Sequence, residues 1–124
     1  MISYCFAPVS GYSSFGSYTG NGSADGPFVY TGFKPKWLMI KVTQATGNGP
    51  LDAWLMYDAV RDTYNVATQY LYANSSQAEG AYAIPDLLSN GFKIRASSTE
   101  SNQNGNVYIY AAFAENPFQY ARAR

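Results

Sequence analysis

Residues 37–43, Trp-Leu-Met-Ile-Lys-Val-Thr, have the strongest β-strand pattern in this sequence and decide its fold class. Branched and aromatic side chains suit the pleated surface of a sheet, and a short continuous apolar run is typical of a strand that is covered on both faces. Residues 53–57, Ala-Trp-Leu-Met-Tyr, repeat the Trp-Leu-Met tripeptide after a turn-rich loop at 45–50. The two runs therefore predict antiparallel neighbours, the first of them central in its sheet.

The large side chains of these two runs are expected inside the protein. Residues of this kind within apolar runs are usually buried. We therefore assign four of them to a core between two sheets: Trp37, Met39, Trp54 and Met56. Cys5 has apolar neighbours and is expected to be a small, buried hydrophobic residue.

Further strand patterns lie on both sides of this pair. Ile2, Tyr4 and Phe6 alternate with Ser3, Cys5 and Ala7, which predicts a first strand. Other short strands are expected at residues 12–19, 28–31, 70–73, 92–95 and 107–115. Because no helical pattern of about 10–15 residues separates them, roughly eight short strands predict an all-β, antiparallel β-sandwich and not a parallel sheet.

Turn-forming residues separate these strands. Stretches rich in Gly, Asn and Pro lie at 19–27 and 32–35, and Ser89-Asn90-Gly91 predicts a hairpin turn. We expect 59–69 to be a loop with a helical turn, 84–88 a corner and 97–106 a polar loop tip. Five glycines are expected where a corner needs a positive φ angle or a close backbone approach: Gly20, Gly22, Gly26, Gly32 and Gly91.

The composition excludes several classes of function. The chain has 124 residues, the length of one domain, and its 8 basic and 8 acidic residues cancel. A net charge of zero gives no electrostatic attraction for a phosphate backbone, so nucleic acid is not an expected partner. With no His and one Cys, the chain cannot form a Ser-His-Asp or Cys-His nucleophile system, a zinc cluster or an internal disulfide.

The sequence also predicts no membrane insertion and no export by a signal peptide. No stretch approaches the roughly 20 apolar residues of a membrane span. The first residues have no basic region, and Pro8 and Ser10 interrupt their apolar run.

One internal similarity links the two ends of the chain. Ile2, Phe6 and Ala7 match Ile109, Phe113 and Ala114 at identical spacing. Two interpretations stay open: a chance similarity between β-rich hexamers, or a domain duplication in which the first strand imitates the last strand of a preceding copy.

Six stretches, in order over residues 15–118, resemble a domain that is common in bacteriophage tail-fibre and other virion proteins. They are FGSYTGNG (15–22), GPFVYTGFKP (26–35), WLMIK (37–41), LYAN (71–74), LSNGFKIR (88–95) and YIYAAFAENPF (108–118). That domain is of otherwise unassigned function, and its fold is similar to laminin-G or concanavalin-like jelly rolls. The resemblance implies one jelly-roll domain over residues 1–118, followed by a short C-terminal tail at 119–124.

The resemblance also implies a function and partners. It is that of a non-enzymatic virion structural protein, a lectin-like tail-fibre module that is made in the host cytoplasm. Such a module forms a homo-oligomer, for example a trimer, contacts other virion proteins and recognises host surface glycans, with no cofactor. The alternative is a self-assembling capsid decoration or fibre subunit that binds no glycan. Residues 119–124 are a solvated tail or extend an edge strand onto a neighbouring subunit.

Aromatic residues in polar, loop-adjacent settings are the candidates for ligand contact. Tyrosine provides a rigid ring and a hydroxyl at little entropic cost, which suits both sugar binding and subunit contact. The sequence does not choose between these uses, although we favour subunit contact slightly. The candidates are Tyr12, Tyr18, Tyr64, Tyr70 and Tyr82.

Carboxylates are weaker candidates. Asp52, Asp58 and Asp62 could hold calcium, but they lack the dense oxygen spacing of a calcium loop. We expect Asp58 and Asp62 to pair with Arg61 or to cap a local turn, and we predict no metal. A glycoside hydrolase needs two carboxylates at a fixed separation. The three glutamates are scattered, which argues against an enzyme: Glu79, Glu100 and Glu115.

Overall fold

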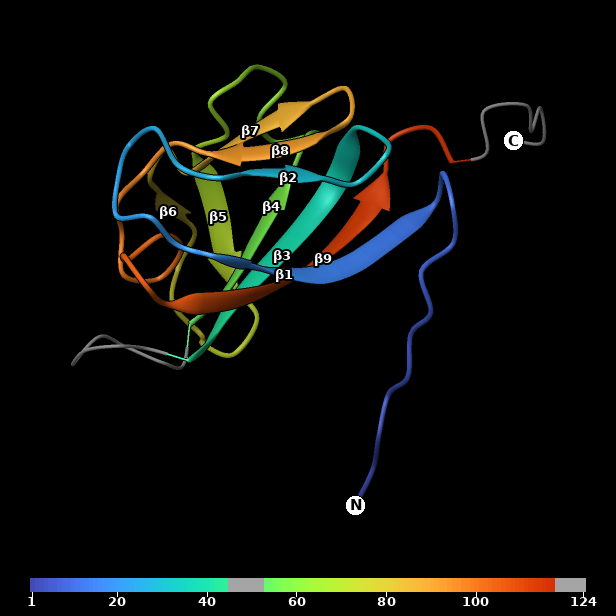
Figure 1. The fold of residues 1–124 in the computed structure, drawn as a ribbon. Coiled ribbons are helices and arrows are strands. Elements are labelled where there is room, and N and C mark those ends of the chain that lie inside the picture. The colour runs from blue at the N-terminus through green and yellow to red at the C-terminus, as the bar shows by residue number, and fades with distance from the viewer. Residues whose placement is uncertain (45–52, 118–124) are drawn as a thin grey trace.

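The computed structural model describes residues 1–44 and 53–117, and this part of the chain is all-β (Figure 1). Six strands form one sheet in the order β1-β9-β3-β4-β5-β6, and three form a second in the order β2-β8-β7. Every strand pair is antiparallel. The predicted antiparallel β-sandwich is confirmed. The strands are β1 (Ser13–Thr19), β2 (Phe28–Tyr30), β3 (Pro35–Gln44), β4 (Trp54–Asp58), β5 (Gln69–Tyr72), β6 (Gly80–Ala81), β7 (Pro85–Leu88), β8 (Gly91–Ile94) and β9 (Val107–Ala114).

Strand β3 lies at the centre of the larger sheet, between β9 and β4. Ile40 is paired with Leu55 of β4 and with Tyr110 of β9. Met39 is paired with Met56, so the Trp-Leu-Met runs are antiparallel neighbours as predicted. No helix in the described residues is long and apolar enough to span a membrane.

The core lies between the two sheets and follows the period-two alternation of the strands. Leu38 and Ile40 of β3 and Phe92 of β8 are completely buried. Tyr18 and Tyr108 stack on each other with ring centroids 5.1 Å apart. Their hydroxyls donate to the carbonyl oxygens of Ser101 and Thr99, each at 2.7 Å, so the core can hold two tyrosines without leaving these hydroxyls unpaired.

A buried asparagine joins two loops at one end of the sandwich. The Asn102 amide nitrogen donates to the Ser23 and Ala96 carbonyls at 2.7 and 2.9 Å, and its Oδ1 accepts from the Asn21 backbone at 2.9 Å. The stretch 97–106 is therefore not the exposed loop tip that its polarity predicts. Ser101, Asn102 and Asn106 are buried. The Asn102 side chain provides hydrogen bonds to backbone groups of the loops, which have no strand partner there.

The five glycines lie where the sequence places them, for two reasons. Gly22 and Gly32 have φ angles of 69° and 84°, in the left-handed region. At Gly20, Gly26 and Gly91 the backbone of another segment is too close for a side chain. A Cβ on Gly91 would lie 2.1 Å from the Val29 carbonyl oxygen, so glycine permits β8 to pair with β2.

The predicted first strand is wrong. Residues 1–8 form no strand, and Ile2, Tyr4 and Phe6 are 84%, 84% and 70% exposed. Cys5, predicted to be buried, is exposed as well. A turn at Val9 and Ser13 separates this segment from β1, and the segment pairs with no strand of the sheet (Figure 1). Alternating apolar residues predict an extended backbone, but a β-strand also needs a neighbouring strand for its hydrogen bonds. We call residues 1–8 the N-terminal arm.

The predicted position of the Trp and Met residues is also wrong. Leu38 and Ile40 point into the core, so Trp37 and Met39 must point to the other face of the sheet. On β4, Met56 and Trp54 pair with Met39 and Lys41 and follow the same rule. They are half-buried on the outer face, whereas Leu55 and Tyr57 are buried in the core. A continuous apolar run is apolar on both faces, and here one face lies outside the sandwich.

The segment 84–88 is a strand for most of its length and not only a corner. Pro85 begins β7, where its missing N–H costs no ladder bond. Asp86 is paired with Lys93 in the register that joins β7 to β8, and Ser89-Asn90 makes the turn between them.

Neighbouring residues of β3 test which face is the core. Leu38→Ala empties space in a completely buried site and is expected to lower the free energy of unfolding by about 2–5 kcal/mol. Met39→Ala on the outer face is expected to lower it by about 1 kcal/mol or less. Urea denaturation of both variants measures the difference, and equal losses would contradict the assignment of the two faces.

Candidate functional site

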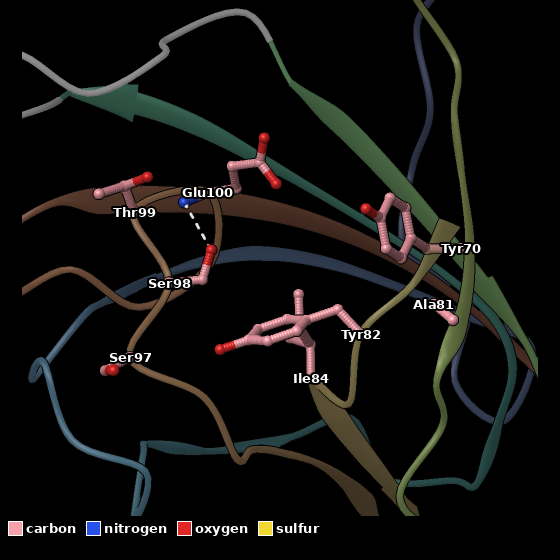
Figure 2. Close-up of a pocket in the computed structure, with 8 residues that line it drawn as sticks. All are labelled: Tyr70, Ala81, Tyr82, Ile84, Ser97, Ser98, Thr99 and Glu100. Atoms are coloured by element: carbon pink, nitrogen blue, oxygen red, sulfur yellow. Dashed lines mark hydrogen bonds between the residues drawn. The ribbon is translucent and has the colours of Figure 1, made fainter. Parts of the chain in front are cut away.

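One hollow at an end of the sandwich combines aromatic rings with polar groups (Figure 2). Its volume is about 580 Å³. One wall comes from β5, β6 and the segment that follows, and the other from the loop 97–100. The lining residues are Tyr70, Ala81, Tyr82, Ile84, Ser97, Ser98, Thr99 and Glu100. We call it the end pocket. Residues 73–79, all exposed, join β5 to β6, the two strands of the first wall.

The aromatic wall is held in place by close packing. Gly80 is paired with Tyr70, and a Cβ there would lie 2.4 Å from the Tyr70 ring, so only glycine lets the ring lie over the β6 backbone. The Tyr70 ring also contacts Tyr57 and Tyr72, with centroids 6.0 and 5.2 Å away. Tyr82 is 51% exposed, and its backbone N–H donates to the Thr68 carbonyl at 2.8 Å. The Tyr70 ring is thus fixed by its neighbours, whereas the Tyr82 ring is open to solvent.

The polar wall is a tight turn with three hydroxyls and a carboxylate. The Ser98 carbonyl accepts from the backbone N–H groups of Ser101 and Asn102, at 3.2 and 2.7 Å. The Ser98 hydroxyl accepts from the Glu100 N–H at 3.2 Å (Figure 2). Because Asn102 is itself buried and fully bonded, this wall is fixed to the core and formed before any ligand binds.

Glu100 is oriented by a tyrosine that remains protonated. The Tyr72 hydroxyl donates to both carboxylate oxygens of Glu100, at 3.1 and 3.2 Å. Burial, followed by the neighbouring Tyr70 and Glu100, raises the pKa of Tyr72 above its usual range. The Tyr72 hydroxyl therefore keeps its proton and remains a hydrogen-bond donor to the Glu100 carboxylate.

Tyr57 packs behind Tyr70 and is completely buried. Its hydroxyl has no hydrogen-bond partner among the described residues. Burial, with a smaller effect from Tyr70 and Glu100, raises its pKa well above the ordinary tyrosine value. The interior next to the end pocket therefore holds a neutral hydroxyl with unused hydrogen-bonding capacity.

The end pocket suits an uncharged, hydroxyl-rich ligand. A ring face accepts the C–H groups of a sugar, while serine, threonine and glutamate groups exchange hydrogen bonds with its hydroxyls. Among its lining residues Glu100 alone is charged, which disfavours an anionic ligand. Glycoside hydrolysis needs two facing carboxylates. The lining contains one carboxylate, that of Glu100. Glu79 and Glu115 are not lining residues and form ion pairs with Arg61 and Lys34.

The structure brings together two of the five candidate tyrosines, Tyr70 and Tyr82. Tyr18 is only 8% exposed and belongs to the core, so its assignment to a contact surface is wrong. Its polar neighbours in sequence misled the prediction, because alternate residues of β1 face opposite ways. Tyr12 lies 6.0 Å from the Phe113 ring near the start of β1, and Tyr64 is 85% exposed in the segment between β4 and β5.

The loop 97–100 was missed as part of the site. Its residues read as an ordinary polar loop, and nothing local indicates that they face Tyr70 and Tyr82. A lone glutamate in a run of serine, threonine and asparagine is the only signal that could have suggested it.

The candidate calcium ligands have other partners. The Asp58 carboxylate accepts from the backbone N–H groups of Val60 and Arg61 at 3.0 and 2.8 Å and forms an ion pair with the Arg61 side chain. The predicted role of Asp58 as a turn cap paired with Arg61 is confirmed. Asp62 accepts from the backbone N–H of Thr68, six residues further along, at 2.6 Å. It therefore closes the loop before β5 and is not paired with Arg61 in any contact of the described residues. Asp52 lies outside the described residues, within which no group of three or more Cys, Asp and Glu is placed to hold a metal ion.

The Asp58 cap predicts a pH-dependent contribution to stability. Burial alone would raise the pKa of Asp58, but the hydrogen bonds from Arg61 and Val60 outweigh it and lower the pKa below its usual value. A lowered pKa in the folded state stabilises the fold above the unfolded pKa of about 3.9, and this contribution is lost as the pH falls through the folded value.

Asp58→Asn is therefore expected to lower the free energy of unfolding by about 1 kcal/mol at neutral pH, and the difference should fade below about pH 4. Denaturant titrations across this range measure it. Glu115→Gln is the control, since its pair with Lys34 is exposed and should contribute less than about 0.5 kcal/mol. A difference that grows toward acid pH would contradict the assigned role.

Comparison with known proteins identifies a family but no function. No curated protein and no solved structure matches the chain. The family model of DUF7483, a domain of unknown function, matches residues 1–117. Because the match covers nearly the whole sequence, the chain belongs to the DUF7483 family.

Proposed function

We propose that this chain is a non-enzymatic virion structural module of the tail-fibre type, which recognises a neutral glycan through the end pocket. The observation that carries the proposal is the pairing of Tyr70 and Tyr82 with the hydroxyl-bearing loop 97–100 around one open hollow. The resemblance of six sequence stretches to virion domains supports the tail-fibre setting. In that setting the chain acts as a homo-oligomer among other virion proteins.

The aromatic residues support sugar as the ligand class. The open ring of Tyr82 offers a flat apolar surface, and the end pocket is accessible from solvent at that side. Small-molecule sites combine such apolar surface with a few fixed polar groups. In the end pocket these groups are the Ser97, Ser98 and Thr99 hydroxyls and the Glu100 carboxylate.

The charge of the site narrows the ligand class. Glu100 accepts hydrogen bonds from sugar hydroxyls, and it repels carboxylate, sulfate and phosphate groups. The lining has no Lys or Arg to offset it. A neutral hexose or an amino sugar is therefore preferred over a sialylated or sulfated one.

A second function has its own support. The outer face of the larger sheet carries apolar side chains that are only partly buried, and it suits a self-assembling subunit that binds no glycan. The two functions use different residues and can be tested separately.

Glycan-array binding by wild type and a Tyr82→Ala variant tests the proposal. The variant removes the open ring without emptying the core, so binding to neutral glycans should weaken by roughly tenfold, or about 1.4 kcal/mol. Tyr64→Ala is the matched control, because this tyrosine is more exposed and lies outside the end pocket. Its binding should not change.

A second variant separates recognition from folding. Glu100→Gln keeps the shape of the side chain but removes its charge, so discrimination against anionic glycans should fall while the melting temperature changes little. Equal binding by wild type and Tyr82→Ala, or no binding to any neutral glycan, would refute the end pocket as a sugar site.

A further inference from the structure

The outer face of the six-stranded sheet is apolar over most of its width. Phe113 of β9 contacts Phe15 of β1 and Trp37 of β3, with ring centroids 5.8 and 5.6 Å apart. A cleft of about 990 Å³ lies between this face and the N-terminal arm. The large side chains of the face that line it are Phe15, Trp37, Met39, Trp54, Ile109 and Phe113.

Charge is almost absent from both sides of the cleft. Lys41 is the one charged residue in its lining, and the amine lies 5.2 Å from the centre of the Trp54 ring. Residues 2–8 of the arm carry no charged side chain. Apolar surface gains little from contact with water, and a contiguous patch of this kind marks a site of association.

The arm provides apolar side chains that the rest of its own chain leaves exposed. Tyr4 and Phe6 line the cleft, yet they remain 84% and 70% exposed. Phe6 contacts Phe15 at a centroid distance of 5.6 Å, which keeps the arm beside the face without covering it. Figure 1 shows the arm leaving the start of β1 on the side away from the smaller sheet.

The arm and the face together form a self-complementary surface. A twofold interface requires that one surface carry both halves of the contact, so that each copy gives and receives the same groups. Ile2 and Phe6 have the same spacing as Ile109 and Phe113, which point outward from β9. An extended arm laid along β9 of another copy can therefore place its two large side chains in step with those of the face.

We propose that the outer face is an interface between two copies of this chain, in which the N-terminal arm of each copy covers the face of the other. Lys41 is the single charged side chain in the lining of the cleft, so little charge repulsion opposes the association of identical copies. The interface does not depend on sugar binding, because no residue of the end pocket lines this cleft.

A disulfide trap between two different copies tests the proposal. Wild type carries a single thiol, at Cys5 in the arm. The partner is a Cys5→Ser, Ser17→Cys double variant with a larger affinity tag, since Ser17 is exposed and lines the cleft on the face side. Mild oxidation of the mixture should give a disulfide-linked heterodimer on a non-reducing gel, which a contact within one chain cannot produce.

The matched control moves the thiol to the smaller sheet. A Cys5→Ser, Tyr30→Cys variant places it on β2, at a residue that is 69% exposed. This control should form heterodimer at least tenfold more slowly. Equal rates for the two partners would overturn the proposal, because they would indicate random collision.

The mass of the protein in solution gives an independent measurement. Light scattering at micromolar concentration should report a dimer for wild type and a monomer for a Tyr4→Ser, Phe6→Ser variant. The arm packs in no core, so this variant should still unfold cooperatively, with a melting temperature lowered only by the loss of the stabilisation that the dimer provides, and Tyr64→Ser should remain dimeric. A monomeric wild type, or a dimer that survives the arm substitutions, would refute arm exchange. Neither result bears on glycan-array binding, which reports on the end pocket alone.

Discussion

The pairing of β3 with β9 and β4 is the constraint on which the rest of the molecule depends. Strand pairing fixes which face each residue occupies, because a shift of one residue would exchange the two faces. With Leu38 and Ile40 directed inward, Phe92 and Tyr108 complete a core between the sheets. The same register directs Trp37 and Met39 outward, so one strand provides both the core and the apolar outer face.

Much of the fold could be predicted from local sequence. The face of the sheet on which each side chain lies could not. The strand segments and turns could be predicted from alternating apolar residues and from the positions of the glycines. The antiparallel pairing of 37–43 with 53–57 could be predicted from the repeated Trp-Leu-Met tripeptide. A run that is apolar at every position does not indicate which side is inside, which explains the error at Trp37 and Trp54. Nothing local separates Tyr18 from Tyr82 as a candidate, since both lie near predicted loops. Tyr18 stacks on Tyr108 in the core, whereas Tyr82 lines the end pocket, and both positions depend on contacts between distant segments.

Hydrogen bonds around Asn102 and Ser98 hold the polar wall of the end pocket in place. Asn102 binds the loops 20–26 and 97–106 to each other, and the turn at Ser98 is bonded to its backbone. The hydroxyls of the polar wall therefore do not have to become ordered when a ligand binds, which reduces the entropic cost of recognition. The sequence could supply Tyr70 and Tyr82 as candidates, but this wall depends on contacts between segments far apart in the chain.

The exposed connection at 73–79 has a consequence for how such a module can diversify. It joins β5 to β6, which carry Tyr70 and Ala81 of the end pocket, and none of its residues is buried. Loops of this kind accept insertions and substitutions at small energetic cost. Changes in its length would reshape the rim beside Tyr70 and Tyr82 while the sandwich stays intact. A family built on this framework could thus acquire new specificities through one short segment, and a peptide tag or a second domain could be inserted there by design.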